Sequence, residues 1–230
     1  MKYGIFLIGI IFLLGSACKR VKTPEAVNER ETWINSFSDS VDYYKQYSEK
    51  IDTRLQEVNA KVADMLNNFE MVRNPREVSG YYILKGWNSK LPLITTGIYA
   101  RINENEKIEL IATLGGATFN QIAVGENYSE VVHHDQAFNF RHERYNTVYF
   151  AGGKADTIAD YIATHHNEKL KLLYLEGKKQ NSFIIPDIEK EMITETWNLY
   201  AAQKEAHELQ KTLWLCSRKI DTFRRFMNEK

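Results

Sequence analysis

Three histidines and an aspartate in the middle of the chain are the side chains best suited to bind a metal ion: His133, His134, Asp135 and His142. Imidazole nitrogens and carboxylate oxygens are usual ligands of zinc. Their spacing matches no defined metal-binding motif, however, and adjacent histidines on a strand point to opposite faces of the sheet. At most one of His133 and His134 then reaches a single site. The sequence therefore predicts no bound metal and no cofactor. If the protein did bind a metal ion, these four residues would be the candidate ligands.

Motifs of the common enzyme classes are missing from the chain. It contains no Gly-x-Ser-x-Gly nucleophile elbow, no His-Glu-x-x-His zinc motif and no Gly-x-Gly-x-x-Gly fingerprint. The run Gly152-Gly153-Lys154 lacks the earlier glycine and the following Ser or Thr of a phosphate-binding loop, since Val148 and Ala155 stand there. We therefore predict no catalytic residues and a protein that is not an enzyme.

Cys18 is the other residue with chemistry of its own, because its thiol can carry a lipid through a thioether bond. It follows the basic residue Lys2, an apolar stretch at 5–14 and the small residues Gly15, Ser16 and Ala17. These are the parts of a secretory signal, and the apolar stretch is shorter than the about 20 residues needed to span a bilayer. The leader resembles that of a bacterial lipoprotein precursor, with Gly15 where such leaders most often have leucine.

The resemblance implies a fate for each part of the N-terminus. Residues 1–17 form a signal peptide that is removed, and Cys18 becomes lipidated with a diacylglycerol and an amide-linked acyl chain such as palmitate. Residues 18–33 then form a lipidated linker, in which each basic side chain near an anionic surface adds about 1 kcal/mol of membrane affinity. Because Lys19 replaces the aspartate that retains lipoproteins in the inner membrane, the expected location is the outer membrane, facing the periplasm of the cell envelope.

Composition limits the partners and the cross-links of the mature chain. The 230 residues include 30 Lys plus Arg and 30 Asp plus Glu, so the formal net charge is zero. A neutral chain without a basic stripe argues against nucleic acid as a ligand. Acylation of Cys18 leaves Cys216 as the only free thiol, and no intramolecular disulfide then forms.

Apolar or aromatic residues recur every three or four positions from Ile34 to Val72, and again from Ile188 to Met227. A spacing of this kind, kept over roughly five heptads, predicts coiled-coil helices. We place the first helix at 34–75, where Asn74-Pro75 ends it because the residue before a proline disfavours helical geometry. We place the second helix at 186–230. The predicted seam contains Phe37, Val41, Tyr44, Ile51, Leu55, Val58, Val62, Leu199, Leu209, Leu213, Ile220 and Phe223.

The two helices are predicted to pack antiparallel as a stalk, because their lengths are nearly equal and the middle of the chain can return the polypeptide. An antiparallel register places Leu55 opposite Ala206, which pairs a large side chain with a small one as interdigitated cores require. The same register places Phe37 opposite Phe223. A homodimer, in which each helix pairs with its copy in another molecule, is the alternative.

Residues 76–185 have the β-branched and aromatic runs, separated by turn residues, that are typical of strands. The runs 93–102 and 107–114 predict a hairpin, and a short helix is expected at 155–166. The predicted fold class is α+β, with a central, mostly antiparallel β domain between two long terminal helices. The expected function is the presentation of this domain to another envelope component. A periplasmic accessory protein that binds a small molecule, metal or glycan is the alternative.

Overall fold

The computed structural model describes residues 24–73, 75, 79–90, 95–125, 127–130, 140–141 and 145–228. Two long helices, α1 (Pro24–Leu66) and α3 (Asp187–Asn228), flank a β-rich region that contains the short helix α2 (Gly153–Thr164). The described strands are β1 (Phe69–Val72), β2 (Tyr81–Leu84), β3 (Gly97–Asn103), β4 (Ile108–Gly115), β5 (Gln121–Val124), β6 (Asn127–Glu130), β7 (Phe140–Arg141), β8 (Tyr145–Ala151), β9 (Lys171–Glu176) and β10 (Lys179–Ile184). The predicted α+β class is confirmed.

The described strands form two antiparallel sheets. One sheet has the order β1-β2-β3-β4-β8-β7, and the other has the order β10-β9-β5-β6. The hairpin predicted from the sequence is β3–β4, in which Gly97 pairs with Thr113 and Ile102 pairs with Ile108. We refer to residues 69–200, which contain both sheets, α2 and the first part of α3, as the β domain.

The core of the β domain lies where α2 and the first part of α3 cover the sheets. Ile158 and Ile162 of α2 and Met192 of α3 are fully buried in one cluster with strand residues. Burying an aliphatic side chain of this size stabilises a fold by about 1.5–3 kcal/mol. The two sheets are also joined by Tyr174 of β9, which is 1% exposed.

Helix α3 binds the part of strand β3 that is not paired with strand β2. Strand β2 pairs only with the last two residues of β3, Ile102 and Asn103. Nearer the start of β3, the Ile98 N–H donates to Glu189 Oε2 at 3.0 Å, and the Ala100 N–H donates to the Met192 sulfur at 3.3 Å. Side chains of a helix therefore satisfy backbone donors that the neighbouring strand does not reach.

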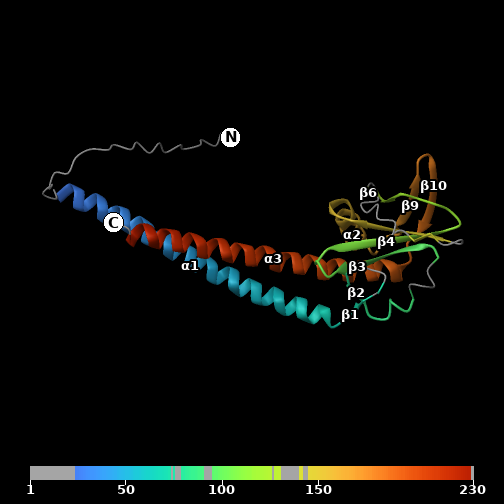
Figure 1. Ribbon diagram of the computed structural model, residues 1–230, viewed down its shortest axis with the longest axis horizontal. Coiled ribbons are helices and arrows are strands. Elements are labelled where there is room, and N and C mark those ends of the chain that lie inside the picture. Colours follow the sequence, from blue (N-terminus) through green and yellow to red (C-terminus); the bar gives the residue numbers. More distant parts are fainter. Residues whose placement is uncertain are drawn as a thin grey trace.

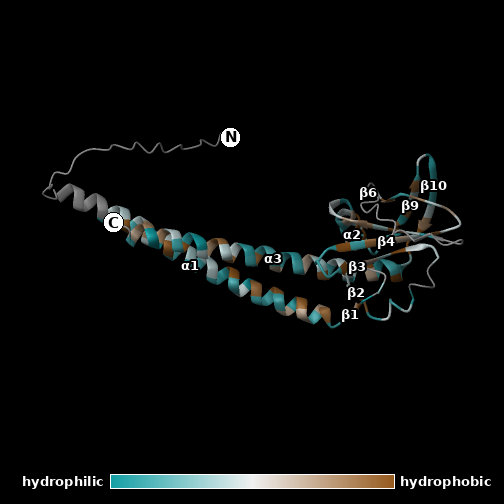
Figure 2. Ribbon diagram, viewed as in Figure 1, coloured by the Kyte–Doolittle hydropathy of each residue, from teal (hydrophilic) through white to brown (hydrophobic). Residues whose placement is uncertain are grey.

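Helices α1 and α3 pack side by side and extend away from the sheets (Figure 1). We call α1 together with residues 201–228 of α3 the helix pair. The rings of Phe37 and Phe223 lie 5.6 Å apart, and Arg54 forms an ion pair of 2.9 Å with Glu205. Because later residues of α1 meet earlier residues of α3, the two helices run antiparallel. Figure 2 shows hydrophobic residues recurring along both helices between hydrophilic ones.

The first helix differs from its predicted bounds at both ends. It begins at Pro24, so part of the segment predicted as a linker (18–33) is helical, with a proline that suits a first helical position. It ends at Leu66 rather than at residue 75, because Asn67 and Asn68 form a turn and Phe69–Val72 forms strand β1. Apolar spacing continues through this strand, but its backbone pairs with β2.

The start of α3 also departs from the predicted apolar repeat. Ile188 is 51% exposed, whereas its neighbour Glu189 is 6% exposed. At this point α3 contacts β3 and not α1, so the buried face follows the sheet. In the described part of the chain, no helix is long and apolar enough to cross a membrane.

Candidate functional site

The residues with metal-binding chemistry in the sequence cannot be located in the structure. His133, His134, Asp135 and His142 lie outside the described residues, and so does Cys18. Among the residues that are described, no group of three or more His, Cys, Asp or Glu side chains is arranged to hold a metal ion.

All twelve residues of the predicted seam are buried or half-buried. Leu55, Val58 and Ala206 form one cluster against which Val62, Leu209 and Leu213 pack. Two of the predicted opposite pairs are thus found together, Leu55 with Ala206 and Phe37 with Phe223.

Among the residues whose burial is described, the exposed aromatic side chains lie on the helix pair. Tyr43 is 62% exposed and Trp214 is 59% exposed. In the β domain, the Tyr and Trp residues whose burial is described are buried or half-buried, as Tyr81 and Trp87 are. Among the residues whose burial is described, the β domain therefore has no exposed Tyr or Trp side chain.

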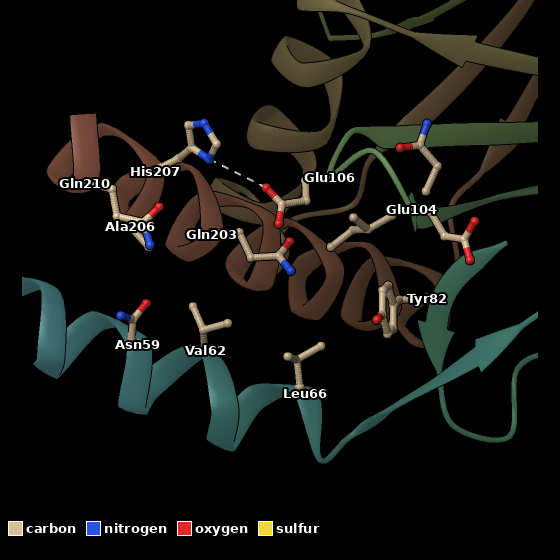
Figure 3. Close-up of a pocket in the computed structure, with 12 residues that line it drawn as sticks. Asn59, Val62, Leu66, Tyr82, Glu104, Glu106, Gln203, Ala206, His207 and Gln210 are labelled. Atoms are coloured by element: carbon tan, nitrogen blue, oxygen red, sulfur yellow. Dashed lines mark ion pairs between the residues drawn. The ribbon is translucent and has the colours of Figure 1, made fainter. Parts of the chain in front are cut away.

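A cleft of about 310 Å³ lies where the two long helices diverge beside the β3–β4 turn (Figure 3). We call it the junction cleft. It has an apolar floor and a polar rim, and its volume is at the lower end of the about 300–1,000 Å³ typical of ligand pockets. Its lining consists of Asn59, Val62, Leu66, Tyr82, Ile102, Asn103, Glu104, Glu106, Gln203, Ala206, His207 and Gln210.

The β3–β4 turn that forms the rim is organised by Asn103. Its side-chain oxygen accepts the backbone N–H groups of Asn105 and Lys107 at 3.0 and 3.1 Å. Its side-chain nitrogen donates to Glu109 Oε1 at 3.0 Å. Asparagine side chains commonly stabilise turns in this way. The turn therefore holds the two glutamates that follow Asn103 in a defined position at the cleft.

Glu104 is held by two contacts on the side away from the helices. Its backbone N–H donates to the Gly80 carbonyl at 3.0 Å, and its carboxylate pairs with Arg73 at 3.0 Å. A Cβ atom at Gly80 would lie 2.9 Å from Glu104 Oε1. A glycine at position 80 therefore allows this close approach between the two chain segments.

Glu106 combines an unusual backbone with an incompletely paired carboxylate. Its φ angle is 56°, and it is the non-glycine residue with positive φ in the described part of the chain. This conformation costs an L-residue about 1–2 kcal/mol. The carboxylate lies 3.8 Å from His207 Nδ1, with side chains 59% and 72% exposed respectively. That distance is longer than the about 2.7–2.9 Å of a charge-assisted hydrogen bond.

Gln203 provides the buried polar atom of the cleft. Its Oε1 is buried and has no hydrogen-bond partner among the described residues. A buried acceptor left in this state costs about 1–3 kcal/mol. Figure 3 shows Gln203 in the middle of the cleft, between Val62 and Leu66 of α1 on one side and Glu106 on the other.

The lining of the junction cleft favours binding through hydrogen bonds and charge. Its described residues offer carboxylates, amides, an imidazole and a phenol, and they include no Ser, Thr, Cys, Lys or Arg. A second hollow of about 460 Å³ lies between α2 and the start of α3 and is lined by His166, Asn167, Asp187, Glu191, Thr194 and Glu195. Its acidic residues do not form a metal cluster.

The β domain also contains a buried carboxyl group outside the cleft, that of Glu189. Burial raises the pKa of Glu189 to about 7, although the hydrogen bond from the Ile98 N–H acts in the opposite direction. Tyr174 lies nearby and its hydroxyl approaches the carbonyls of Gly97 and Thr113 at 3.0 and 2.9 Å. Desolvation, followed by the Glu189 charge, raises the pKa of Tyr174 far above its usual range.

Sequence reasoning did not identify the junction cleft. Its residues come from α1, β2, β3, the β3–β4 turn and α3, so they are dispersed along the chain. A partial signal is present at Asn59, Gln203 and Gln210, which are uncharged polar residues beside the predicted seam. The small residue Ala206 next to them leaves space that a larger side chain would fill.

Comparisons of the chain with protein-family models, with curated proteins and with solved structures found no match. A functional proposal therefore depends on the residues and their geometry.

Proposed function

We propose that the protein is a lipid-anchored, non-enzymatic component of the bacterial cell envelope. In this proposal the helix pair is an antiparallel coiled-coil stalk that presents the β domain to another envelope component. The arrangement of the helices carries the proposal, because the start of α1 lies at the end of the molecule away from the sheets (Figure 1). Attachment to a membrane near the start of α1 exposes the β domain at the opposite end.

The burial pattern of α1 supports the coiled-coil stalk. From Val41 to Met65, every side chain that is not exposed lies three or four positions from the next, as in a heptad repeat. The members of this stripe are Val41, Tyr44, Ser48, Ile51, Leu55, Val58, Val62 and Met65. At 1.5 Å per residue, α1 from residue 31 to residue 66 is about 54 Å long. A stalk of this length separates a membrane surface from the β domain by several nanometres.

The sequence around Cys18 supports the anchor. Cys18 precedes the first residue of α1, Pro24, by six positions, so an extended chain between them spans at most about 21 Å. Two or more acyl chains anchor a protein stably, whereas one does so only marginally. The proposed location is the outer membrane, with the β domain in the periplasm.

Labelling with a palmitate analogue and fractionation of cell envelopes test the anchor. We expect the native chain to carry the label in the membrane fraction and Cys18→Ser to lose it. Cys216→Ser is the matched control and should keep the label, because Cys216 is buried at 3% exposure in the helix pair. Undiminished labelling of Cys18→Ser would contradict the proposal.

Oxidative cross-linking tests the stalk in a Cys216→Ser background. We expect Val41→Cys with Ile220→Cys to form an intramolecular bridge, because the antiparallel register places these positions opposite each other. Val41→Cys with Met192→Cys should not form one, since Met192 lies in the β-domain core. Bridges formed only between molecules would favour the alternative homodimer and contradict an intramolecular stalk.

A periplasmic accessory protein that binds a small molecule, metal or glycan is the second candidate function. The junction cleft is the observation that favours it, because Gln203 Oε1 is buried there without a described partner. Affinity capture from cross-linked envelopes distinguishes the two functions. A reproducible protein partner supports the first, and a specific ligand without such a partner supports the second.

A further inference from the structure

We infer that the junction cleft binds a basic side chain, Lys or Arg, of a partner protein. This inference deepens the proposed function by naming the chemistry that the partner presents. It does not depend on the lipid anchor, because the cleft is built entirely from residues of α1, β2, β3, the β3–β4 turn and α3. Loss of the anchor and failure of the cleft to bind are therefore separate experimental outcomes.

The charge of the cleft is the first argument. Glu104 and Glu106 both line it, whereas none of its described lining residues is Lys or Arg. Arg73 pairs with Glu104, but its side chain is 80% exposed. Glu106 has only the 3.8 Å contact with His207 among the ion pairs of the described residues. The carboxylate of Glu106 therefore keeps acceptor capacity for a cation from outside the chain.

The amides of the lining are the second argument, because Asn59, Gln203 and Gln210 line the cleft and amide side-chain oxygens accept hydrogen bonds. An ammonium group offers three donors and a guanidinium group offers five, and neither has an acceptor. A basic side chain in the cleft therefore supplies donors to these amides and a positive charge to Glu106. A neutral ligand supplies only the first of these.

The floor of the cleft matches the other part of a basic side chain. Val62, Leu66 and Ala206 present aliphatic surface beside the polar rim. Lys and Arg bury their methylene stems on apolar surface while the charged head meets polar groups. A volume of about 310 Å³ is sufficient for a single basic side chain. A glycan shares the need for hydrogen bonds, but it leaves the negative charge unmatched.

The backbone at Glu106 agrees with a binding role for its side chain. Its φ of 56° is a conformation that favours glycine. Residues held in such conformations cluster at binding and catalytic sites, where the side chain has a use that offsets the strain. A glutamate therefore occupies a position where the backbone conformation of the turn favours glycine.

Methyl NMR of the full-length chain in detergent, labelled with ¹³C at alanine methyl groups, tests the inference. The probes are N-acetyl-arginine methylamide and the citrulline analogue, which has nearly the same shape but no charge. Ala206 lines the cleft and reports binding, whereas the buried Ala112 of β4 is a distant reference. We expect the Ala206 signal to shift saturably with the arginine probe, and the citrulline probe to bind at least tenfold more weakly.

Variants identify the residues responsible. Glu106→Gln and Gln203→Leu should each weaken binding of the arginine probe at least fivefold. Glu208→Gln makes the same charge change on α3 but pairs with Lys211 outside the lining, so it should leave the affinity unchanged. An unshifted Ala112 signal shows that each variant is folded. If Gln203→Leu does not fold, Glu106→Gln still decides the question.

Three results would overturn the inference. The first is an Ala206 signal that does not move with the arginine probe at millimolar concentrations. The second is equal binding of the arginine and citrulline probes, because charge then has no part in recognition. The third is a shift caused by N-acetylglucosamine and not by the arginine probe, which assigns the cleft to a glycan.

Discussion

The buried carboxyl group of Glu189 makes the stability of the β domain depend on pH. Glu189 is 6% exposed and accepts the Ile98 N–H at 3.0 Å. Tyr174 is the titratable group that interacts with it, and this phenol stays neutral because its own pKa is raised. The substitution Glu189→Gln keeps an acceptor for Ile98 and removes the ionisation.

The magnitude follows from the pKa of Glu189, which burial raises from 4.5 to about 7. Below pH 4.5 the carboxyl group is protonated in both the folded and unfolded chains. As the pH rises toward 7, the unfolded chain releases its proton while the folded chain retains it, so the free energy of unfolding falls. Each tenfold difference in proton affinity is worth about 1.4 kcal/mol, which makes the full loss on the order of 3 kcal/mol.

Urea unfolding at pH 4.5, 6 and 8 measures this effect. Trp87 and Trp197 report on the β domain when Trp33 and Trp214 of the helix pair are replaced by Phe. In that background the chain with Glu189 should lose on the order of 3 kcal/mol between pH 4.5 and pH 8. The Glu189→Gln variant should lose much less and should be the more stable of the two at pH 8.

The matched control is Glu191→Gln, which changes an exposed carboxyl group on the same helix and should keep the pH dependence. The reasoning is refuted if Glu189→Gln loses stability with rising pH in parallel with the unsubstituted chain. Equal stability of the unsubstituted chain at pH 4.5 and pH 8 refutes it as well.

Three further substitutions test packing and backbone strain. Tyr174→Phe removes the hydroxyl that approaches the carbonyls of Gly97 and Thr113, and urea unfolding should show a loss of about 1–3 kcal/mol; an unchanged midpoint would contradict the role of this bridge between the sheets. Leu55→Ala removes a side chain that is 8% exposed in the helix pair, so thermal unfolding followed by far-UV circular dichroism should show a loss of about 2–3 kcal/mol. A loss no larger than that of an exposed substitution on α1 would mean that α1 and α3 do not pack in this register. Glu106→Gly relieves a positive φ of 56° and should raise the melting temperature by about 2–4 °C, whereas a lower one would argue against strain in the turn.

Local patterns in the sequence were sufficient to predict the main elements of the fold. Apolar residues spaced three and four positions apart give α1 and α3 one apolar stripe each. On α1, the residues of this stripe are buried or half-buried, as predicted. The β3–β4 hairpin was predictable because two β-rich runs flank a polar turn that begins at Asn103. Such patterns are readable because the residues that produce them are neighbours in the chain.

Local patterns were insufficient where the same spacing of apolar residues is compatible with more than one backbone structure or buried face. Phe69 and Val72 continue the helical repeat of α1, but pairing with β2 places them in strand β1. Ile188 fits the repeat of α3, but Ile188 is exposed and the neighbouring Glu189 is buried against β3 instead. In both places the backbone partner lies elsewhere in the chain, and it overrides the local preference.

The sequence by itself determined the α+β class, the two long amphipathic helices and the residues of their apolar stripes, because these follow from spacing along the chain. Tertiary structure alone decided the junction cleft and the burial of Glu189. The cleft joins residues from position 59 to position 210, and its unpaired Gln203 oxygen is buried only because α1 and the β3–β4 turn lie beside α3. Desolvation depends on such neighbours from distant segments, and hydrophobic periodicity carries no information about them.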